Sequence, residues 1–171
     1  MHDFSRFIRD IPDFPRAGII FKDITPLLGN PTAFHRAIDE FALRYKLEAV
    51  DVVAGTEARG FIFGAALAYR LGAAFVPIRK QSKLPYHTYE AIYDLEYGSD
   101  IMTIHQDAFS KDSRVLICDD LLATGGTLTA SVELIEKLEG HIVGIAILIE
   151  LTELNGRDQI PDYDIFSLIK Y

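Results

Sequence analysis

Short apolar segments alternate along the chain with stretches of helical periodicity. Four segments are rich in β-branched and other apolar residues, as strands buried on both faces are: 50–55 (VDVVAG), 73–78 (AAFVPI), 114–119 (RVLICD) and 141–151 (HIVGIAILIEL). Helical patterns lie between them at 30–46, 59–72 and 126–140. This alternation predicts an α/β fold with a mainly parallel sheet covered by helices on both faces.

Local signals place the ends of these helices. Asn30 is the expected N-cap of the first, and Pro31 fits its first turn. Gly72 is expected to stop the second helix and Gly140 the third. The first helix buries one face, which is made of Phe34, Ile38, Phe41, Ala42 and Tyr45.

The pattern changes between residues 80 and 100. This segment (KQSKLPYHTYEAIYDLEYGSD) is polar and aromatic and has no firm period. We expect a long excursion of two irregular strands with a mobile tip. Segments of this size in compact domains are usually functional or disordered. No role is predicted for Tyr86 and His87, which lie near its middle.

Composition narrows the class of protein. The 171 residues fit one domain, and a net charge of −8 argues against nonspecific binding to nucleic acid or an anionic membrane. The apolar runs are too short to span a membrane, and the first ten residues do not form a signal peptide, so a cytoplasmic protein is expected. The single cysteine, Cys118, cannot form an internal disulfide and is expected to be a small buried apolar residue.

The most informative stretch is 116–131 (LICDDLLATGGTLTAS). It places Asp119 and Asp120 at the carboxyl end of a predicted parallel strand, where α/β sheets bind ligands. Glycines then lead into a helix, so that backbone N–H groups can approach an anion. A 5-phosphosugar satisfies both halves: its hydroxyls donate to the two carboxylates, and its phosphate binds Ala123, Thr124, Gly125, Gly126 and Thr127. The alternative is an acidic turn in which the glycines serve only the chain reversal.

Two common phosphate motifs do not fit this stretch. No lysine follows the glycines, so it is not a P-loop, and the glycines are adjacent, so it is not the dinucleotide fingerprint. Instead, VLICDDLLATGGT (115–127) resembles the phosphoribosyl diphosphate motif of type I phosphoribosyltransferases. The two leucines and ATGGT resemble the adenine-specific branch in particular. The resemblance continues, in the same order along the chain, in FPRAGIIFKDITPLL, VAGTEARGFIFG, VPIRKQSKLP, YDLEYG and IELTELNGR.

The resemblance implies one phosphoribosyltransferase domain over residues 1–171. It implies a central mainly parallel sheet flanked by helices, a small N-terminal hood over about 1–30 and a flexible loop over about 80–100. The reaction it implies is purine salvage: adenine and 5-phospho-α-D-ribose 1-diphosphate give AMP and diphosphate. Mg²⁺ is then bound by the diphosphate and ribose hydroxyls of the substrate, and no metal ligands are assigned to the protein.

Several charged residues receive roles from this resemblance. Arg59 belongs to a diphosphate loop with Glu57 and Ala58, and the peptide bond between the latter two is expected to be cis. Without the resemblance, Arg59 is equally well explained by an ion pair at a helix start. Arg79 is expected to reach the diphosphate of a neighbouring subunit, and Lys83 to belong to the catalytic loop, which implies a homodimer. Solvated surface charge is the alternative for both.

The base is expected between the hood and the last strands. Ile20 and Lys22 match positions that frame adenine, although many relatives have arginine in place of Lys22. Leu151 matches an apolar contact on the other side. Core packing is the alternative for Ile20 and Leu151.

Catalysis is assigned to the YDLEYG segment. Glu96 is expected to handle the proton on N7 of the base, and Tyr97 to assist closure of the loop. A solvated acid is the alternative for Glu96, and by itself a lone glutamate favours that alternative.

Two rival functions stay open. One is a sister transferase for xanthine, guanine or orotate. A 6-oxopurine enzyme needs a side chain that donates to O6, commonly a lysine, and IELTELNGR offers none. The other is a noncatalytic regulator that senses the sugar diphosphate. Such proteins usually carry an added DNA-binding domain and a basic surface, for which this short, acidic chain has no room.

Overall fold

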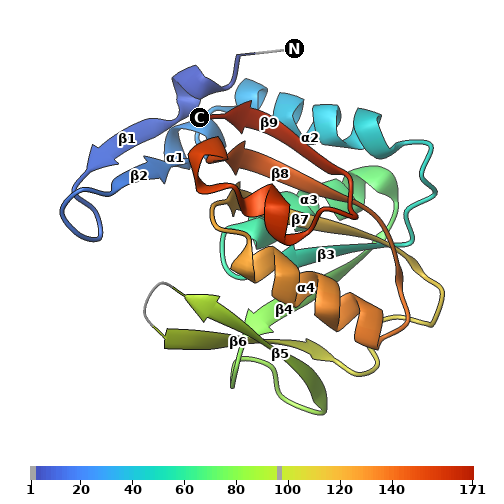
Figure 1. Cartoon of the computed structure of the whole chain (residues 1–171). Coiled ribbons are helices and arrows are strands. Elements are labelled where there is room, and N and C mark those ends of the chain that lie inside the picture. Colours follow the sequence, from blue (N-terminus) through green and yellow to red (C-terminus); the bar gives the residue numbers. More distant parts are fainter. Residues whose placement is uncertain (1–2, 96–97) are drawn as a thin grey trace.

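A seven-stranded sheet forms the centre of the molecule (Figure 1). The computed structural model describes residues 3–95 and 98–171. Strand order across the sheet is β5-β6-β4-β3-β7-β8-β9, and the five strands β4, β3, β7, β8 and β9 are parallel to one another. These are β3 (Val52–Thr56), β4 (Ala74–Lys80), β7 (Arg114–Leu122), β8 (His141–Glu150) and β9 (Ile165–Lys170). The predicted α/β class with a mainly parallel sheet is confirmed.

Helices cover both faces of this sheet. α2 (Pro31–Tyr45) and α3 (Gly60–Leu71) lie on one face, and α4 (Gly126–Lys137) lies on the other (Figure 1). Alternate residues of β7 divide between the two layers: Leu116 and Cys118 pack with α2 and α3, whereas Val115 and Ile117 pack with α4. This alternation explains the uninterrupted apolar runs, because each face of a central strand meets a helix.

The helix ends follow the local signals with one exception. The Asn30 side chain accepts a hydrogen bond from the backbone N–H of Ala33 (3.0 Å), and Gly72 ends α3 with a φ of +71°. α4 ends at Lys137, earlier than expected. The left-handed residue after it is Glu139 (φ +57°), and the Gly140 N–H then donates to the carbonyl of Ile135 (3.0 Å).

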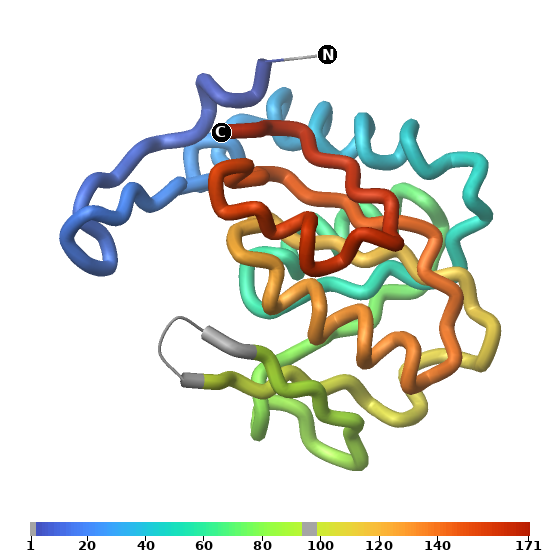
Figure 2. Tube along the Cα trace, in the orientation of Figure 1, coloured from blue at the N-terminus to red at the C-terminus, as the bar shows by residue number. Residues whose placement is uncertain are grey.

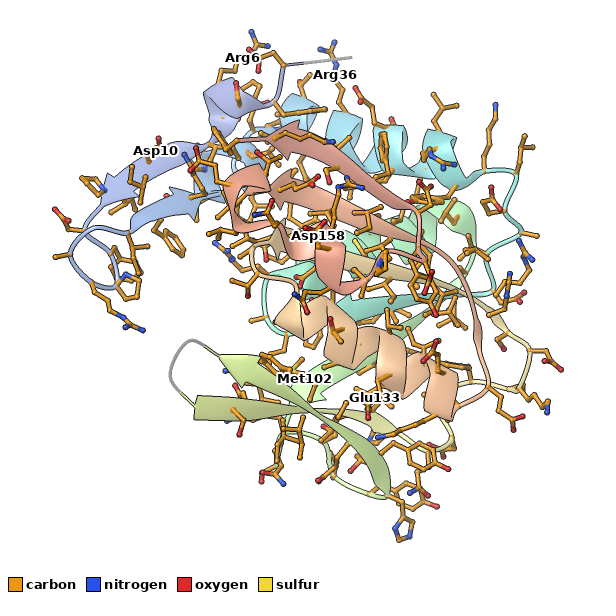
Figure 3. The ribbon with its side chains drawn as sticks, in the orientation of Figure 1. Arg6, Asp10, Arg36, Met102, Glu133 and Asp158 are labelled. Atoms are coloured by element: carbon orange, nitrogen blue, oxygen red, sulfur yellow. The ribbon has the colours of Figure 1, made fainter. Side chains whose placement is uncertain are left out.

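Residues 80–100 are more regular than predicted. β5 (Thr88–Leu95) and β6 (Gly98–His105) pair in antiparallel register from Thr88↔His105 to Leu95↔Gly98, and they extend the sheet beyond β4. The expectation of two irregular strands is therefore wrong. The hairpin packs against α4, where Met102 is buried (Figure 3).

The N-terminal hood extends from the sheet as a separate hairpin (Figure 2). β1 (Arg9–Pro12) and β2 (Ile20–Asp23) form it, between the short turn η1 (Ser5–Phe7) and α1 (Thr25–Leu28). These strands, and β9, were not among the strands predicted from the sequence. Two further short turns, η2 (Thr152–Leu154) and η3 (Gly156–Gln159), precede β9. Among the described residues, no helix is long and apolar enough to cross a membrane.

Candidate active site

The carboxyl ends of β3 and β7 are neighbours in the sheet, and a cavity of about 380 Å³ opens beside them. The loop after β3, the end of β7 and the start of α4 line it, together with Tyr93 of β5. It brings together these predicted residues: Glu57, Ala58, Arg59, Asp119, Asp120, Ala123, Thr124, Gly125, Gly126 and Thr127. Segments 60 residues apart in sequence thus meet where parallel sheets bind ligands.

The acid pair lies in the wall of this cavity. Asp119 is 7% exposed and Asp120 is 5% exposed, and the backbone N–H of Asp120 donates to Oδ1 of Asp119 (2.8 Å). Burial, and then the neighbouring charge of Asp120, raises the pKa of Asp119 to about 8. Burial also raises the pKa of Asp120, and the Arg59 guanidinium opposes that rise. Both carboxyl groups are therefore harder to ionise than in an unfolded chain, and they line the wall where the ribose hydroxyls are expected.

A glycine allows a helix to lie against this pair. Gly60 is the first residue of α3, and a Cβ atom there would lie 2.6 Å from Oδ1 of Asp119 and 3.0 Å from the Cys118 carbonyl. Any larger residue would push the helix start away from the carboxylate. Sequence analysis gave Gly60 no role, although it lies in the VAGTEARGFIFG segment.

Arg59 forms an ion pair within the cavity. One guanidinium nitrogen, Nη2, lies 2.7 Å from Oδ2 of Asp120, without the geometry of a hydrogen bond. Nη1 donates to the carbonyl of Lys22 (3.3 Å), and the guanidinium lies 4.9 Å from the ring centre of Phe21. Arg59 therefore connects the acid pair to the hood. The two predicted explanations, ion pair and phosphate ligand, do not exclude each other, because the pair lies where the ligand is expected.

The loop between β7 and α4 provides an uncapped helix start. Gly125 is the N-cap residue of α4, with a φ of +94°, and no side chain caps the helix. The first turn of α4 also contains no acidic residue. Its backbone N–H groups and helix dipole are therefore available to an anion, which is the arrangement expected for a phosphate site.

A second loop, at the start of η3, packs against the loop between β7 and α4. Gly156, at the start of η3, packs so closely that a Cβ atom there would lie 2.3 Å from the Ala123 carbonyl and 3.0 Å from the Gly125 nitrogen. The next residue, Arg157, donates two hydrogen bonds to the buried carboxylate of Glu150 (2.5 and 2.8 Å). Hydrogen bonding from Arg157 lowers the pKa of Glu150. Sequence analysis missed this support, although all three supporting residues lie in the IELTELNGR segment.

Comparison with known proteins decides the family. A model of the phosphoribosyl transferase domain matches residues 28–171. An adenine phosphoribosyltransferase from Solidesulfovibrio magneticus is 53% identical over 168 residues, 98% of each chain. The chain belongs to the adenine phosphoribosyltransferase family. A second such protein, from Clostridium kluyveri, is 56% identical over 96% of this chain and 95% of its own.

Solved structures of adenine phosphoribosyltransferases share the fold. The enzyme from Thermoanaerobacter pseudethanolicus superposes with a TM-score of 0.95, at 52% identity and 98% coverage of both chains. The enzyme from Trypanosoma brucei, which is 28% identical and covers 98% of this chain and 78% of that one, has a TM-score of 0.90 and was solved with AMP, pyrophosphate and ribose-5-phosphate. The family resemblance found in the motifs is thus confirmed.

Some predicted residues of this phosphoribosyltransferase lie outside the cavity. Ile20 is 55% exposed on the hood, and Leu151 packs at the edge of the core. The Lys22 ammonium lies 2.8 Å from Oδ1 of Asp10 and 3.8 Å from the ring centre of Tyr171 (Asp10 is labelled in Figure 3). Only the Lys22 carbonyl, which accepts from Arg59, faces the site.

The residues expected to act on the diphosphate lie in or next to the loop that contains Glu57. The Glu57–Ala58 peptide bond is cis, as predicted. Arg79 lies next to it, with Nε donating to Oε2 of Glu57 (3.0 Å) and Nη1 donating to the Lys83 carbonyl (3.0 Å). The whole of Lys83 is exposed. Glu96 and Tyr97 lie outside the described residues, so their roles stay predictions.

Proposed function

We propose that this chain joins adenine to 5-phospho-α-D-ribose 1-diphosphate in the cavity described above, giving AMP and diphosphate. One observation carries the proposal: a buried acid pair and an uncapped, glycine-rich helix start line the same cavity. The first matches the vicinal hydroxyls of a ribose, and the second matches its 5-phosphate. The names of the relatives supply the base, since those described above are adenine phosphoribosyltransferases.

The proposed chemistry needs little covalent work from side chains. The bond between C1 of the ribose and the diphosphate oxygen breaks, positive charge develops on the ribose ring, and N9 of adenine forms the new bond. The 123–127 loop holds the phosphate and the two aspartates hold the hydroxyls, so the ribose is fixed during the transfer. Arg59 and the loop around Glu57 face the leaving diphosphate and stabilise its charge. Glu96 is proposed to accept the N7 proton of adenine.

We propose that Mg²⁺ enters with the substrate. Among residues 3–95 and 98–171, no three or more His, Cys, Asp or Glu side chains are grouped to hold a metal ion. The carboxylates of Asp119 and Asp120 nevertheless suit it, because Mg²⁺ prefers oxygen donors and keeps several water ligands. They would bind ribose hydroxyls that in turn contact the ion. When bound, Mg²⁺ neutralises charge on the leaving diphosphate.

We further propose a homodimer in which Arg79 of one subunit reaches the diphosphate of the other. Large apolar side chains on one layer of the molecule support an interface: Ile62 and Tyr69 of α3 are 40% and 90% exposed, and Leu43 of α2 is 63% exposed. The cytoplasmic location expected from the sequence stays a prediction.

The test is a comparison of bases. The protein is incubated with sugar diphosphate and Mg²⁺ and with labelled adenine, guanine, hypoxanthine or xanthine, and nucleotide formation is followed. We expect AMP from adenine and at least about 10²-fold lower kcat/KM for the other bases, because an unpaired polar group on the base is costly in a site shaped for adenine. Preference for another base would indicate a sister transferase. Sugar diphosphate binding without any nucleotide would indicate a sensor.

A further inference from the structure

Tyr93 lines the cavity together with the phosphate loop, residues 123–127. It lies on β5 at the first position of the YDLEYG segment, where the sequence predicted no role for it, and it is half-buried. The hairpin that carries it packs on α4, the helix whose start forms the phosphate site. Figure 3 shows the two elements together, with Met102 labelled on the hairpin and Glu133 on the helix. The hairpin thus contributes one side chain to the wall of the cavity.

The surroundings of the phenol keep it protonated. Its hydroxyl donates to Oδ2 of Asp100 at 3.4 Å, which is a long and therefore weak hydrogen bond. Burial, and then the charge of Asp100, raises the pKa of Tyr93, whereas hydrogen bonding with the Thr127 side chain lowers it. Thr127 belongs to the phosphate loop. The phenol therefore lies between a carboxylate and the phosphate site, with its proton available to donate.

Lys80 would allow the Tyr93 hydroxyl to leave Asp100 for another hydrogen-bond acceptor. The Lys80 ammonium lies 2.7 Å from Oδ2 of Asp100, the same oxygen that accepts from Tyr93. If the phenol turned to another acceptor, Asp100 would keep its charge partner and would not be left unpaired. Hydrogen bonds to a doubly charged phosphate are stronger than the long bond seen here.

We propose that Tyr93 is a further substrate-binding residue, which donates a hydrogen bond to the 5-phosphate held by residues 123–127. This inference rests on the proposed function, because it takes the phosphate monoester of the sugar as the ligand. Such a hydrogen bond would also help to hold the hairpin against α4. Because Tyr93 precedes Glu96 by three residues in the chain, phosphate binding would then fix the strand that leads to the predicted catalytic segment.

The experiment compares Tyr93→Phe with Tyr89→Phe. Tyr89 lies on the same strand but outside the cavity. Calorimetry measures binding of two probes, ribose 5-phosphate and inorganic diphosphate with Mg²⁺. In Tyr93→Phe we expect the Kd of ribose 5-phosphate to rise about 10- to 100-fold, as for loss of one hydrogen bond to a charged group. The Kd of diphosphate should stay within about twofold, and Tyr89→Phe should match the parent for both.

Other outcomes overturn the inference. Unchanged binding of ribose 5-phosphate to Tyr93→Phe, in a protein that makes AMP, would remove Tyr93 from the phosphate site and leave the proposed function intact. Equal weakening of both probes would mean that the change distorts the whole cavity. A parent protein that binds neither probe and makes no AMP would overturn the proposed function as well. Asp100→Asn is a second variant, in which the neighbour of the Tyr93 hydroxyl is neutral and Tyr93 itself is unchanged. This variant should bind ribose 5-phosphate at least as tightly as the parent protein does.

Discussion

Replacing Asp119 by asparagine should make the protein more stable and less able to bind its substrate. Asparagine keeps the shape of the side chain, and its amide oxygen can still accept from the Asp120 N–H, as the carboxylate does at 2.8 Å. Its amide nitrogen can donate to Asp120. What disappears is a buried carboxyl group that is costly to ionise beside a second one, a cost that the fold tolerates where the ligand is expected.

The structure gives the size and the sign of the effect. Burial raises the pKa of Asp119 to about 8, against about 3.9 in an unfolded chain. The folded protein therefore binds this proton more tightly than the unfolded chain, and its stability falls as pH rises between these two values. At about 1.4 kcal/mol per pKa unit, the loss at pH 7 is on the order of 4 kcal/mol. Asp119→Asn removes this loss, so the variant should gain most near pH 8 and almost nothing near pH 4.

Thermal unfolding without ligand or Mg²⁺ tests this, in buffers free of phosphate because phosphate is expected to bind the site. We expect Asp119→Asn to melt at least about 5 °C above the parent at pH 8, with a gain that shrinks steadily toward pH 4. The exposed Asp107 offers a matched control, since Asp107→Asn should follow the parent at every pH. Parallel pH profiles for Asp119→Asn and the parent would show that the pair carries no buried charge cost, and the reasoning would fail.

Three further predictions concern residues around the cavity. Glu96→Gln should keep adenine affinity within a few-fold while single-turnover AMP formation slows about 10²- to 10⁴-fold; an unchanged chemical step would return Glu96 to a solvated acid. Arg79→Ala mixed with Asp120→Asn should regain part of the parental activity in verified heterodimers, and no recovery would mean that Arg79 does not act across subunits. Gly156→Ala should raise the KM for sugar diphosphate by about tenfold or more, because its Cβ would lie 2.3 Å from the Ala123 carbonyl and must displace the phosphate loop; an unchanged KM would show that the loop does not depend on this contact.

The sequence predicted those parts of the site that lie next to one another along the chain. One strand carries Asp119 and Asp120 near its end, and the glycines follow it closely in the chain. Their closeness can therefore be predicted without knowledge of the fold. The parallel sheet could also be predicted, because central strands covered on both faces leave long apolar runs. Arg59 joined them only through the family resemblance, since its distance from Asp120 depends on β3 and β7 being neighbours.

Residues whose role depends on tertiary contacts were missed. Gly156 looks like any turn glycine until the fold places it against the Ala123 carbonyl. Tyr93 lies in a segment whose alternation was too weak to predict regular strands, and its place in the cavity follows from docking of that hairpin on α4. Lys22 was matched by resemblance to a position that frames the base, and the structure shows its ammonium next to Asp10 and Tyr171. No local pattern encodes such contacts.

Two acidic residues that line the cavity, Asp120 and Glu57, are paired with arginines in this structure. Arg59 pairs with Asp120 at 2.7 Å, and Arg79 pairs with Glu57 at 3.0 Å. An anion that takes Arg59 must leave Asp120 buried without its cation, which is costly. Inorganic phosphate has only its own hydroxyl to offer Asp120. In the proposed binding mode a sugar diphosphate offers more, because its ribose hydroxyls would donate to Asp120 while its phosphate oxygens accept from Arg59. The internal ion pair should therefore favour ligands that carry both groups, which would let a chain with a net charge of −8 select one polyanion from many.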